Sequence, residues 1–239
     1  MLNFLAVVVL LLSAAPDFTN DKIDHTFIIS FNNKVGNNDL HLDSQNYRNS
    51  FGEIFTVHQF KYYISNIELR DSISGDSEKF PDKYFLIDEG DSMSKIISLN
   101  TSLPHITSIK FMIGVDSLKN VSGVQSGDLD PAKGMFWTWN TGYIMAKLEG
   151  ESPSAQTAGH RFSFHAGGYK KDENTARVVV LKLPQQQRNN VMIEADAAKW
   201  FDALHEIKIE AAPACHEPGK LAVMLADNYS EMFSIPQNK

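Results

Sequence analysis

Histidine is the side chain with which this sequence can most readily bind a metal or move a proton. In "RFSFH" (161–165), the alternation of an extended strand places Phe162 and Phe164 on one face and His165 on the other. His165 comes just before the pair Gly167-Gly168, so we expect it at a strand end beside a glycine-rich turn. Binding residues concentrate at such rims, where loops gather. His165 is therefore a candidate metal ligand, with an ordinary solvated surface histidine as the alternative.

His58 is the second candidate ligand. In "TVHQFKYYISN" (56–66), strict alternation places His58 on the same face as Phe60, Tyr62 and Ile64. A partly buried histidine there is either a ligand or a hydrogen-bonded core residue. Five of the other histidines show no metal-binding spacing: His25, His41, His105, His160 and His205. His216 follows the single cysteine, Cys215, in the loop-like "PACHEPG", which leaves a soft-metal site open there.

Two of the three tryptophans stand one residue apart in "GMFWTWNTGY" (134–143). In an extended strand Trp137 and Trp139 would point to the same face and stand side by side. They are either large core residues or, with Tyr143, an exposed platform on which sugar rings could stack. An intact indole N–H is a donor only, so it cannot act as an ordinary metal ligand.

Other chemistry has weaker signals. Asp116, Asp128 and Asp130 lie in the loop 114–134 and offer oxygens for calcium, but the pattern is not that of an EF-hand. No phosphate-binding glycine loop, G-x-S-x-G elbow or H-E-x-x-H motif occurs. Adjacent strand residues point apart, so Cys215 and His216 make a poor nucleophile–base pair. We therefore predict that the protein is not an enzyme.

The elements that must position these residues are strands. Short runs rich in Phe, Tyr, Ile and Val alternate with turn clusters, which predicts an all-β fold, an antiparallel β-sandwich. We expect 56–71 to bend or carry a bulge, 160–168 and 175–183 to form a hairpin, and 205–212 to be a late strand. One short surface helix is expected near 196–205, with Asp196 as its N-cap.

The start of the chain and its composition bear on location. The segment "MLNFLAVVVLLLSAA" (1–15) is uncharged and too short to span a bilayer, so we predict a signal peptide. Residues 16–239 are then expected to form a single domain with its core at about 25–233, periplasmic or secreted and with no stable membrane insertion after cleavage. A net charge of -7 argues against binding nucleic acid.

Several separated stretches share one further pattern: "FKYYISNIEL", "IKFMIGVD", "GDLDPAKGMFWTWNTGYIMAKLEG", "FHAGGY" and "NYSEMF". Together they resemble the MbnP-like copper-binding family, named for a periplasmic protein encoded near methanobactin genes. The resemblance implies an exported β-sandwich that binds copper and acts in copper acquisition or handling.

The resemblance also implies a kind of site. In some members a tryptophan is oxidised to kynurenine and joins histidines as a copper ligand, and a di-haem partner of the cytochrome c peroxidase type performs the oxidation. Carried over, Trp137 and Trp139 are candidates for modification, His165 is the better-placed histidine and His58 the second. Which tryptophan corresponds stays open. The alternative function is a non-catalytic surface-interaction or glycan-binding β-sandwich without the metal site.

Overall fold

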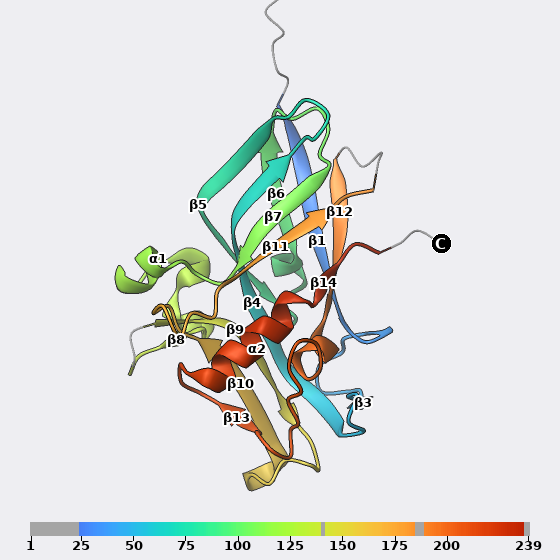
Figure 1. Cartoon of the computed structure of the whole chain (residues 1–239), viewed down its shortest axis with the longest axis vertical. Coiled ribbons are helices and arrows are strands. Elements are labelled where there is room, and N and C mark those ends of the chain that lie inside the picture. The colour runs from blue at the N-terminus through green and yellow to red at the C-terminus, as the bar shows by residue number, and fades with distance from the viewer. Residues whose placement is uncertain (1–23, 140–141, 185–188, 237–239) are drawn as a thin grey trace, which may run out of the picture.

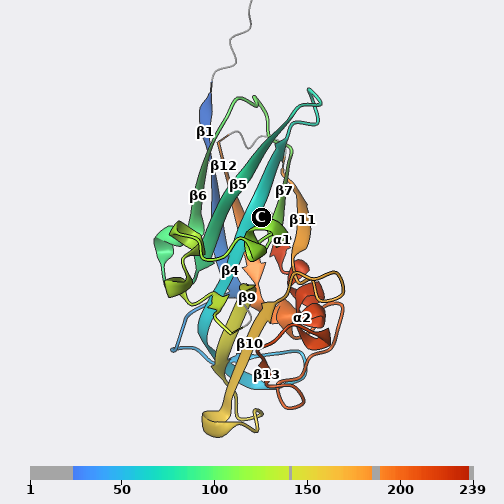
Figure 2. The same ribbon diagram turned by 90° about the vertical axis from the view of Figure 1, so that its left-hand side faces the viewer.

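The computed structural model describes residues 24–139, 142–184 and 189–236, so the predicted signal peptide at 1–15 lies outside the described residues. Two β-sheets enclose a common hydrophobic core, and the long strands run along the length of the molecule (Figures 1 and 2). The fold is mostly β and sandwich-like, as predicted. None of the helices among the described residues is long and apolar enough to cross a membrane.

The smaller sheet is built around strand β1 (His25–Val35), whose alternate residues Phe27, Ile29 and Phe31 are buried. Strand β12 (Asn190–Asp196) pairs with β1 in parallel and β6 (Ile96–Thr101) pairs with it antiparallel. The two short strands β2 (Asn38–Asp39) and β14 (Phe233–Ser234) complete this sheet.

The larger sheet has the order β11-β7-β4-β9-β10-β13. Its strands are β4 (Ile54–Arg70), β7 (Ser108–Ile113), β9 (Gly142–Glu151), β10 (Arg161–Gly167), β11 (Arg177–Lys182) and β13 (Ala214–Cys215). Strands β3 (Tyr47–Arg48) and β5 (Ser77–Asp88) also pair with β4, and β8 (Phe136–Trp137) pairs with β9. The expected irregularity of β4 is present, because its pairing with β9 shifts between Val57 and Gln59.

Two features of the larger sheet differ from the predicted antiparallel arrangement. Strands β10 and β11 do not form the expected hairpin: β11 pairs with β7, while β10 lies between β9 and β13. The pairing of β10 with β13 is parallel, as is that of β1 with β12. Because β13 lies beside β10 where β11 was predicted, the residues next to His165 differ from those expected.

The helix predicted near 196–205 does not form over its whole length. Asp196 accepts a hydrogen bond from the backbone N–H of Ala198, as an N-cap would, but only a 3-10 turn, Ala197–Trp200, follows. The side chain of Asn228 takes the backbone groups that a longer helix would need: its Oδ1 accepts from Leu204 N and His205 N, at 3.0 and 2.7 Å. The main helix is instead α2 (Lys220–Ser230), which packs its buried face against β10 and β11 (Figure 1).

The predicted strand at 205–212 is also absent. Its backbone is held by the buried carboxylate of Glu53, which accepts hydrogen bonds from Ile209 N and Glu210 N at 2.9 and 2.8 Å. These N–H groups are therefore not available to a sheet. The segment 205–212, held by Glu53, leads directly into β13 and so fixes the position of His216, which follows that strand.

Candidate functional site

The site lies on the solvent-side face of β10 and its two neighbours. Phe162 and Phe164 point into the core, both at most 1% exposed, so Ser163 and His165 face outward as the alternation predicts. In the register of the sheet, Ser163 lies opposite Glu149 of β9 on one side and Ala214 of β13 on the other. Polar groups from three strands therefore meet on this face.

His165 is held by an acid and a hydroxyl. Its Nε2 atom lies 2.5 Å from Glu149 Oε1 and 3.1 Å from Ser163 Oγ. Its side chain is 18% exposed, so the imidazole is partly shielded but still accessible. His165 thus lies near the end of β10 with its side chain partly exposed, and its role as a metal ligand stays a prediction.

His216 is the neighbour that the sequence did not single out. It directly follows β13, and its Nε2 lies 2.8 Å from the same Ser163 hydroxyl; the two imidazole centroids are 4.8 Å apart. Burial, reinforced by the charge of the neighbouring His165, lowers the pKa of His216. This favours the neutral imidazole, which is the form that binds a metal ion.

Two charged side chains of β9, Glu149 and Lys147, determine the electrostatic environment of His165 and His216. The hydrogen bond with His165 lowers the pKa of Glu149, against the opposing effect of burial and with help from Lys147. Lys147 is 7% exposed, and burial lowers its pKa. Its ammonium donates to the carbonyl of Gly134 at 2.8 Å and stands 3.7 Å from Glu149. Glu149 therefore stays ionised and faces the imidazoles as a carboxylate.

The two tryptophans are neighbours, as predicted, but in different environments. Their ring centroids are 5.5 Å apart, yet Trp137 is 5% exposed and Trp139 is 64% exposed. Trp137 lies against the backbone of Gly167, where an added Cβ would come within 2.6 Å of its ring. Trp137 is thus a core residue, and Trp139 is the indole that can meet a ligand or an oxidant.

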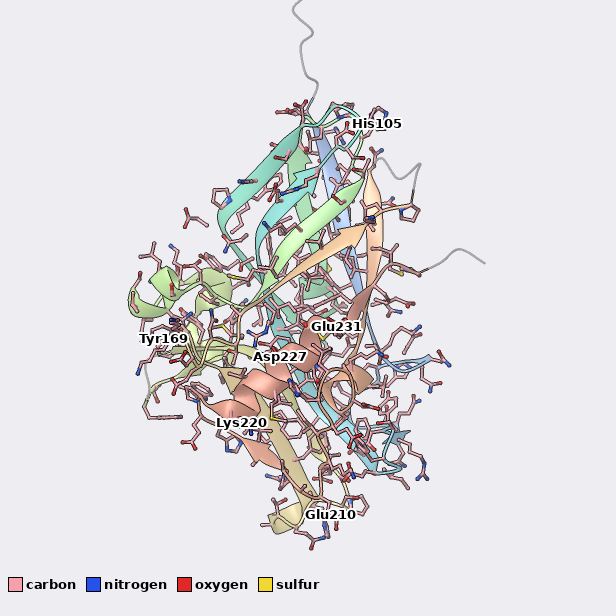
Figure 3. All side chains as sticks on the ribbon, viewed as in Figure 1. His105, Tyr169, Glu210, Lys220, Asp227 and Glu231 are labelled. Carbon is pink, nitrogen blue, oxygen red and sulfur yellow. The ribbon has the colours of Figure 1, made fainter. Side chains whose placement is uncertain are left out.

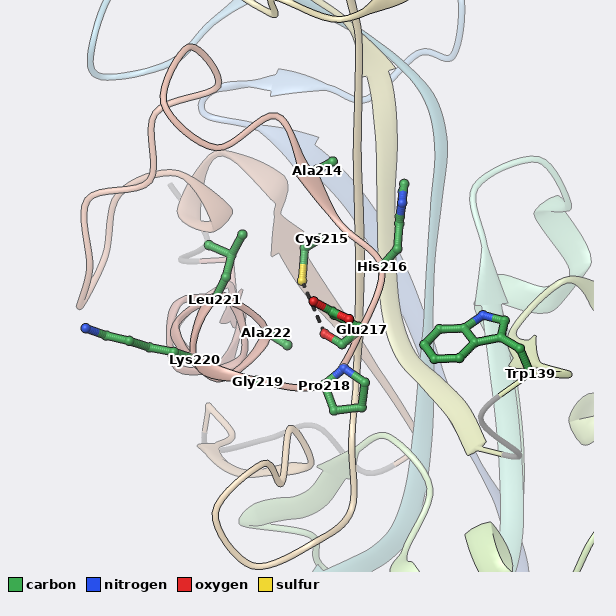
Figure 4. A pocket seen from close by; sticks show the side chains of 10 residues that line it. All are labelled: Trp139, Ala214, Cys215, His216, Glu217, Pro218, Gly219, Lys220, Leu221 and Ala222. Carbon is green, nitrogen blue, oxygen red and sulfur yellow. Dashed lines mark hydrogen bonds between the residues drawn. The ribbon is translucent and has the colours of Figure 1, made fainter.

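Trp139 shares a pocket with His216. The pocket has a volume of about 510 Å³, and Cys215, Glu217 and Pro218 also line it (Figure 4). In Figure 4 Cys215 and His216 point away from each other, and burial raises the pKa of the Cys215 thiol to about 11. The geometry therefore gives Cys215 no role as a nucleophile activated by His216.

His58 lies apart from the tryptophans. The β4 bulge takes it off the apolar face that strict alternation assigned to it: Phe60 and Tyr62 are fully buried, whereas the His58 side chain is 35% exposed. Its Nδ1 contacts Asp43 Oδ1, and its Nε2 is 3.6 Å from Glu151 Oε1. His58 and Glu149 line one pocket of about 450 Å³, but Trp137 and Trp139 are not among its lining residues.

Two other interpretations of the sequence do not fit the geometry. Trp137 and Tyr143 are buried, so they cannot join Trp139 in an exposed stacking platform for sugars. The acidic loop residues are used locally: Asp116 caps α1 (Ser117–Val121), Asp130 caps the next turn, and Asp128 pairs with Lys133. These contacts occupy the oxygens that a calcium ion would need.

The donor set suits copper. Two imidazole Nε2 atoms converge on one point, and imidazole is a favoured ligand of copper and zinc. Within the described ranges, no group of three or more His, Cys, Asp or Glu side chains is arranged as a ready metal cage. Trp139 lines the pocket that His216 also lines.

The likeness to known proteins agrees with this fold. The model of the MbnP family matches residues 24–217. Among solved structures, MbnP from Methylosinus trichosporium is similar at a TM-score of 0.61 and 13% identity, over 84% of this chain and 87% of that one. No curated protein shows significant similarity. Because the family model covers most of the chain, including both tryptophans and all the histidines discussed above, the protein belongs to the MbnP family.

Proposed function

We propose that this protein is an exported, non-enzymatic copper-binding protein that acts in copper acquisition or handling. The observation that carries the proposal is the convergence of His165 Nε2 and His216 Nε2 on Ser163 Oγ, at 3.1 and 2.8 Å. A copper ion that displaced the hydroxyl contacts and the contact between Glu149 and His165 Nε2 would find both nitrogens within reach. Family membership supports the choice of copper over zinc, and the predicted signal peptide supports a periplasmic or secreted location.

Trp139 is the proposed source of a further ligand. It is exposed and lines the pocket that contains His216, whereas Trp137 is buried against Gly167. Four-electron oxidative cleavage of the indole C2–C3 bond would give a ketone at C3 and a formyl group on the nitrogen. Hydrolysis of this group, which releases C2 as formate, would then leave an aryl amine, so that the amine and the ketone could both bind copper. The oxidant would come from a di-haem partner of the cytochrome c peroxidase type, as the family resemblance implies.

In this proposal the remaining groups position and shield the imidazoles. In the metal-free protein Glu149 orients His165 through the 2.5 Å contact to Nε2, which copper would replace. Burial keeps His216 neutral and the pinned loop before β13 holds it in place. These are the contributions of the chain itself, whatever the oxidation state of the copper.

The test is Cu(I) binding by the exported full-length chain, produced with and without a di-haem peroxidase and titrated without oxygen against a chromophoric chelator. Replacing either His165 or His216 by alanine should weaken binding about 100-fold or more, since even indirect contacts to ligands are worth 10–100-fold. Peptide mass mapping should find kynurenine at Trp139 and intact indole at Trp137.

His105→Ala is the matched control, because His105 also lies beside a carboxylate, Asp71, at 3.6 Å, but far from the site. It should bind copper as the unchanged chain does. Substoichiometric copper in both preparations, with no oxidised tryptophan, would overturn the proposal. Equal losses in the His105 and His165 variants would overturn it as well.

A further inference from the structure

A second histidine–carboxylate cluster lies on the same face, at the beginning of β4. The turn between β2 and β3 brings Asp43 to the bulge, where its N–H donates to Val57 O at 2.9 Å. Its carboxylate contacts His58 Nδ1. A carboxylate on one ring nitrogen fixes the proton there and leaves the other nitrogen with a free lone pair, as in histidines that bind metals.

That other nitrogen has no hydrogen-bond partner. His58 Nε2 is shielded from solvent and makes no hydrogen bond to any described residue. Its neighbour Glu151 Oε1, at 3.6 Å, is beyond hydrogen-bonding distance. A buried nitrogen left without a partner destabilises the folded protein. A ligand that accepts the lone pair would remove this destabilisation.

The separation of the two atoms fits a metal ion. An ion about 2.1 Å from both His58 Nε2 and Glu151 Oε1 would span their 3.6 Å separation at an angle of about 120°. This is close to a tetrahedral angle, so neither side chain has to move far. The adjoining pocket of about 450 Å³ leaves room for water to complete the coordination.

The local charge favours a cation. Three carboxylates, those of Asp43, Glu149 and Glu151, line or adjoin the pocket, against the single guanidinium of Arg161. The Arg161 side chain is 77% exposed and its Nε is 4.0 Å from Glu151, so it can turn away without losing a close contact. Imidazole with carboxylate oxygen selects borderline divalent ions such as Zn²⁺.

We propose that His58 and Glu151 form a second metal site, separate from the His165–His216 pair, which takes a divalent transition-metal ion such as Zn²⁺. Asp43 orients His58 and is a positioning residue. Glu149 and Glu151 are two residues apart on β9, so the two sites lie about 7 Å apart along the strand. With two protein ligands, the second site is open and exchanges its ion readily.

The experiment uses the full chain carrying His165→Ala and His216→Ala together, so that failure of the copper proposal cannot affect the result. Zn²⁺ is titrated by calorimetry, and the histidine ring nitrogens are followed by NMR. We expect one Zn²⁺ per chain and a shift of His58 Nε2. Adding His58→Ala should abolish this site, and Glu151→Gln and Asp43→Asn should each weaken it about 10–100-fold.

The control adds His105→Ala to the same double variant. Figure 3 places His105 at the end of the molecule opposite Glu210, and its variant should bind Zn²⁺ as its parent does. Unchanged Zn²⁺ stoichiometry and affinity after His58→Ala would overturn the proposal. So would a Zn²⁺-induced shift confined to other histidines of the double variant, a readout that does not depend on the folding of the His58 variant.

Discussion

At the scale of single residues, the site depends on one hydroxyl. Ser163 Oγ lies between two imidazole nitrogens that come from different strands, at 3.1 and 2.8 Å. In the protein without metal it holds the two rings together. The same arrangement presents both Nε2 atoms to an incoming ion once the hydroxyl contacts and the Glu149 contact are released and the proton that His165 Nε2 shares with Glu149 is displaced.

Glu149 provides a pH-dependent test of this arrangement. Its folded-state pKa is lowered, first by the hydrogen bond with His165, so its stabilising effect is present above the unfolded-state pKa and is lost as the pH falls through the folded-state value. At neutral pH, Glu149→Gln should lower the free energy of unfolding of the metal-free protein by about 1 kcal/mol. The difference should close as the pH falls below the unfolded-state pKa and through the lower folded-state pKa of Glu149. Urea denaturation at each pH measures it.

Glu194→Gln is the matched control, because Glu194 is 25% exposed against 24% for Glu149 and pairs with a lysine, Lys34, instead of a histidine. We expect a loss within about 0.5 kcal/mol for it. A Glu149 variant whose destabilisation grows as the pH falls would contradict the account of this residue.

Alternation along a strand predicted the direction of His165, because the phenylalanines on either side of Ser163 must be buried. The same rule failed for His58, since the bulge adds a residue and turns that side chain off the core face. His216 could not be placed from spacing, because its partner His165 lies 51 positions earlier and they meet only through the pairing of β10 with β13. The signal in the sequence that could have pointed to His216 is its position directly after Cys215 in a loop-like segment.

At the scale of elements, buried polar side chains decide which segments become regular. Asn228 of α2 is fully buried and makes four hydrogen bonds to backbone: two accepted from Leu204 and His205, and two donated to Trp200 O and His205 O. It replaces the hydrogen bonds of the predicted helix and ties the segment 200–205 to α2.

Asn228→Ala should therefore leave buried backbone groups unpaired and lower the free energy of unfolding by about 3 kcal/mol. Chemical denaturation gives the value from the midpoint at constant slope. Lys220→Ala, at the exposed start of the same helix, should stay within about 0.5 kcal/mol. If the two variants were equally stable, Asn228 would not hold this segment.

The strands and the turns between them followed from runs of apolar residues, which is local information. The predictions for 196–205 and 205–212 were wrong for a different reason. In each segment, backbone N–H groups donate hydrogen bonds to one distant side chain, Asn228 or Glu53. Helix α2 did carry a local signal, since its buried residues Ala222, Leu225, Ala226 and Tyr229 fall at helical spacing. The composition of the surrounding sequence favours strands, and so the helical periodicity alone did not lead to a predicted helix there.

At the scale of the whole molecule, the fold of the MbnP family places the polar face of β9, β10 and β13 beside the turn that carries the tryptophans. The core between the sheets accounts for most of the aromatic residues, and a second buried cluster accounts for Trp137 and Tyr143. Core packing does not account for the exposed Trp139 or for the polar face. These two features, together with family membership, motivate the copper proposal.

The most direct test is anomalous diffraction at the copper absorption edge from crystals of the copper-loaded protein. We expect a copper peak about 2.0–2.1 Å from both His165 Nε2 and His216 Nε2, with residue 139 in the pocket that His216 lines. A copper peak bound through neither of these two histidines would contradict it.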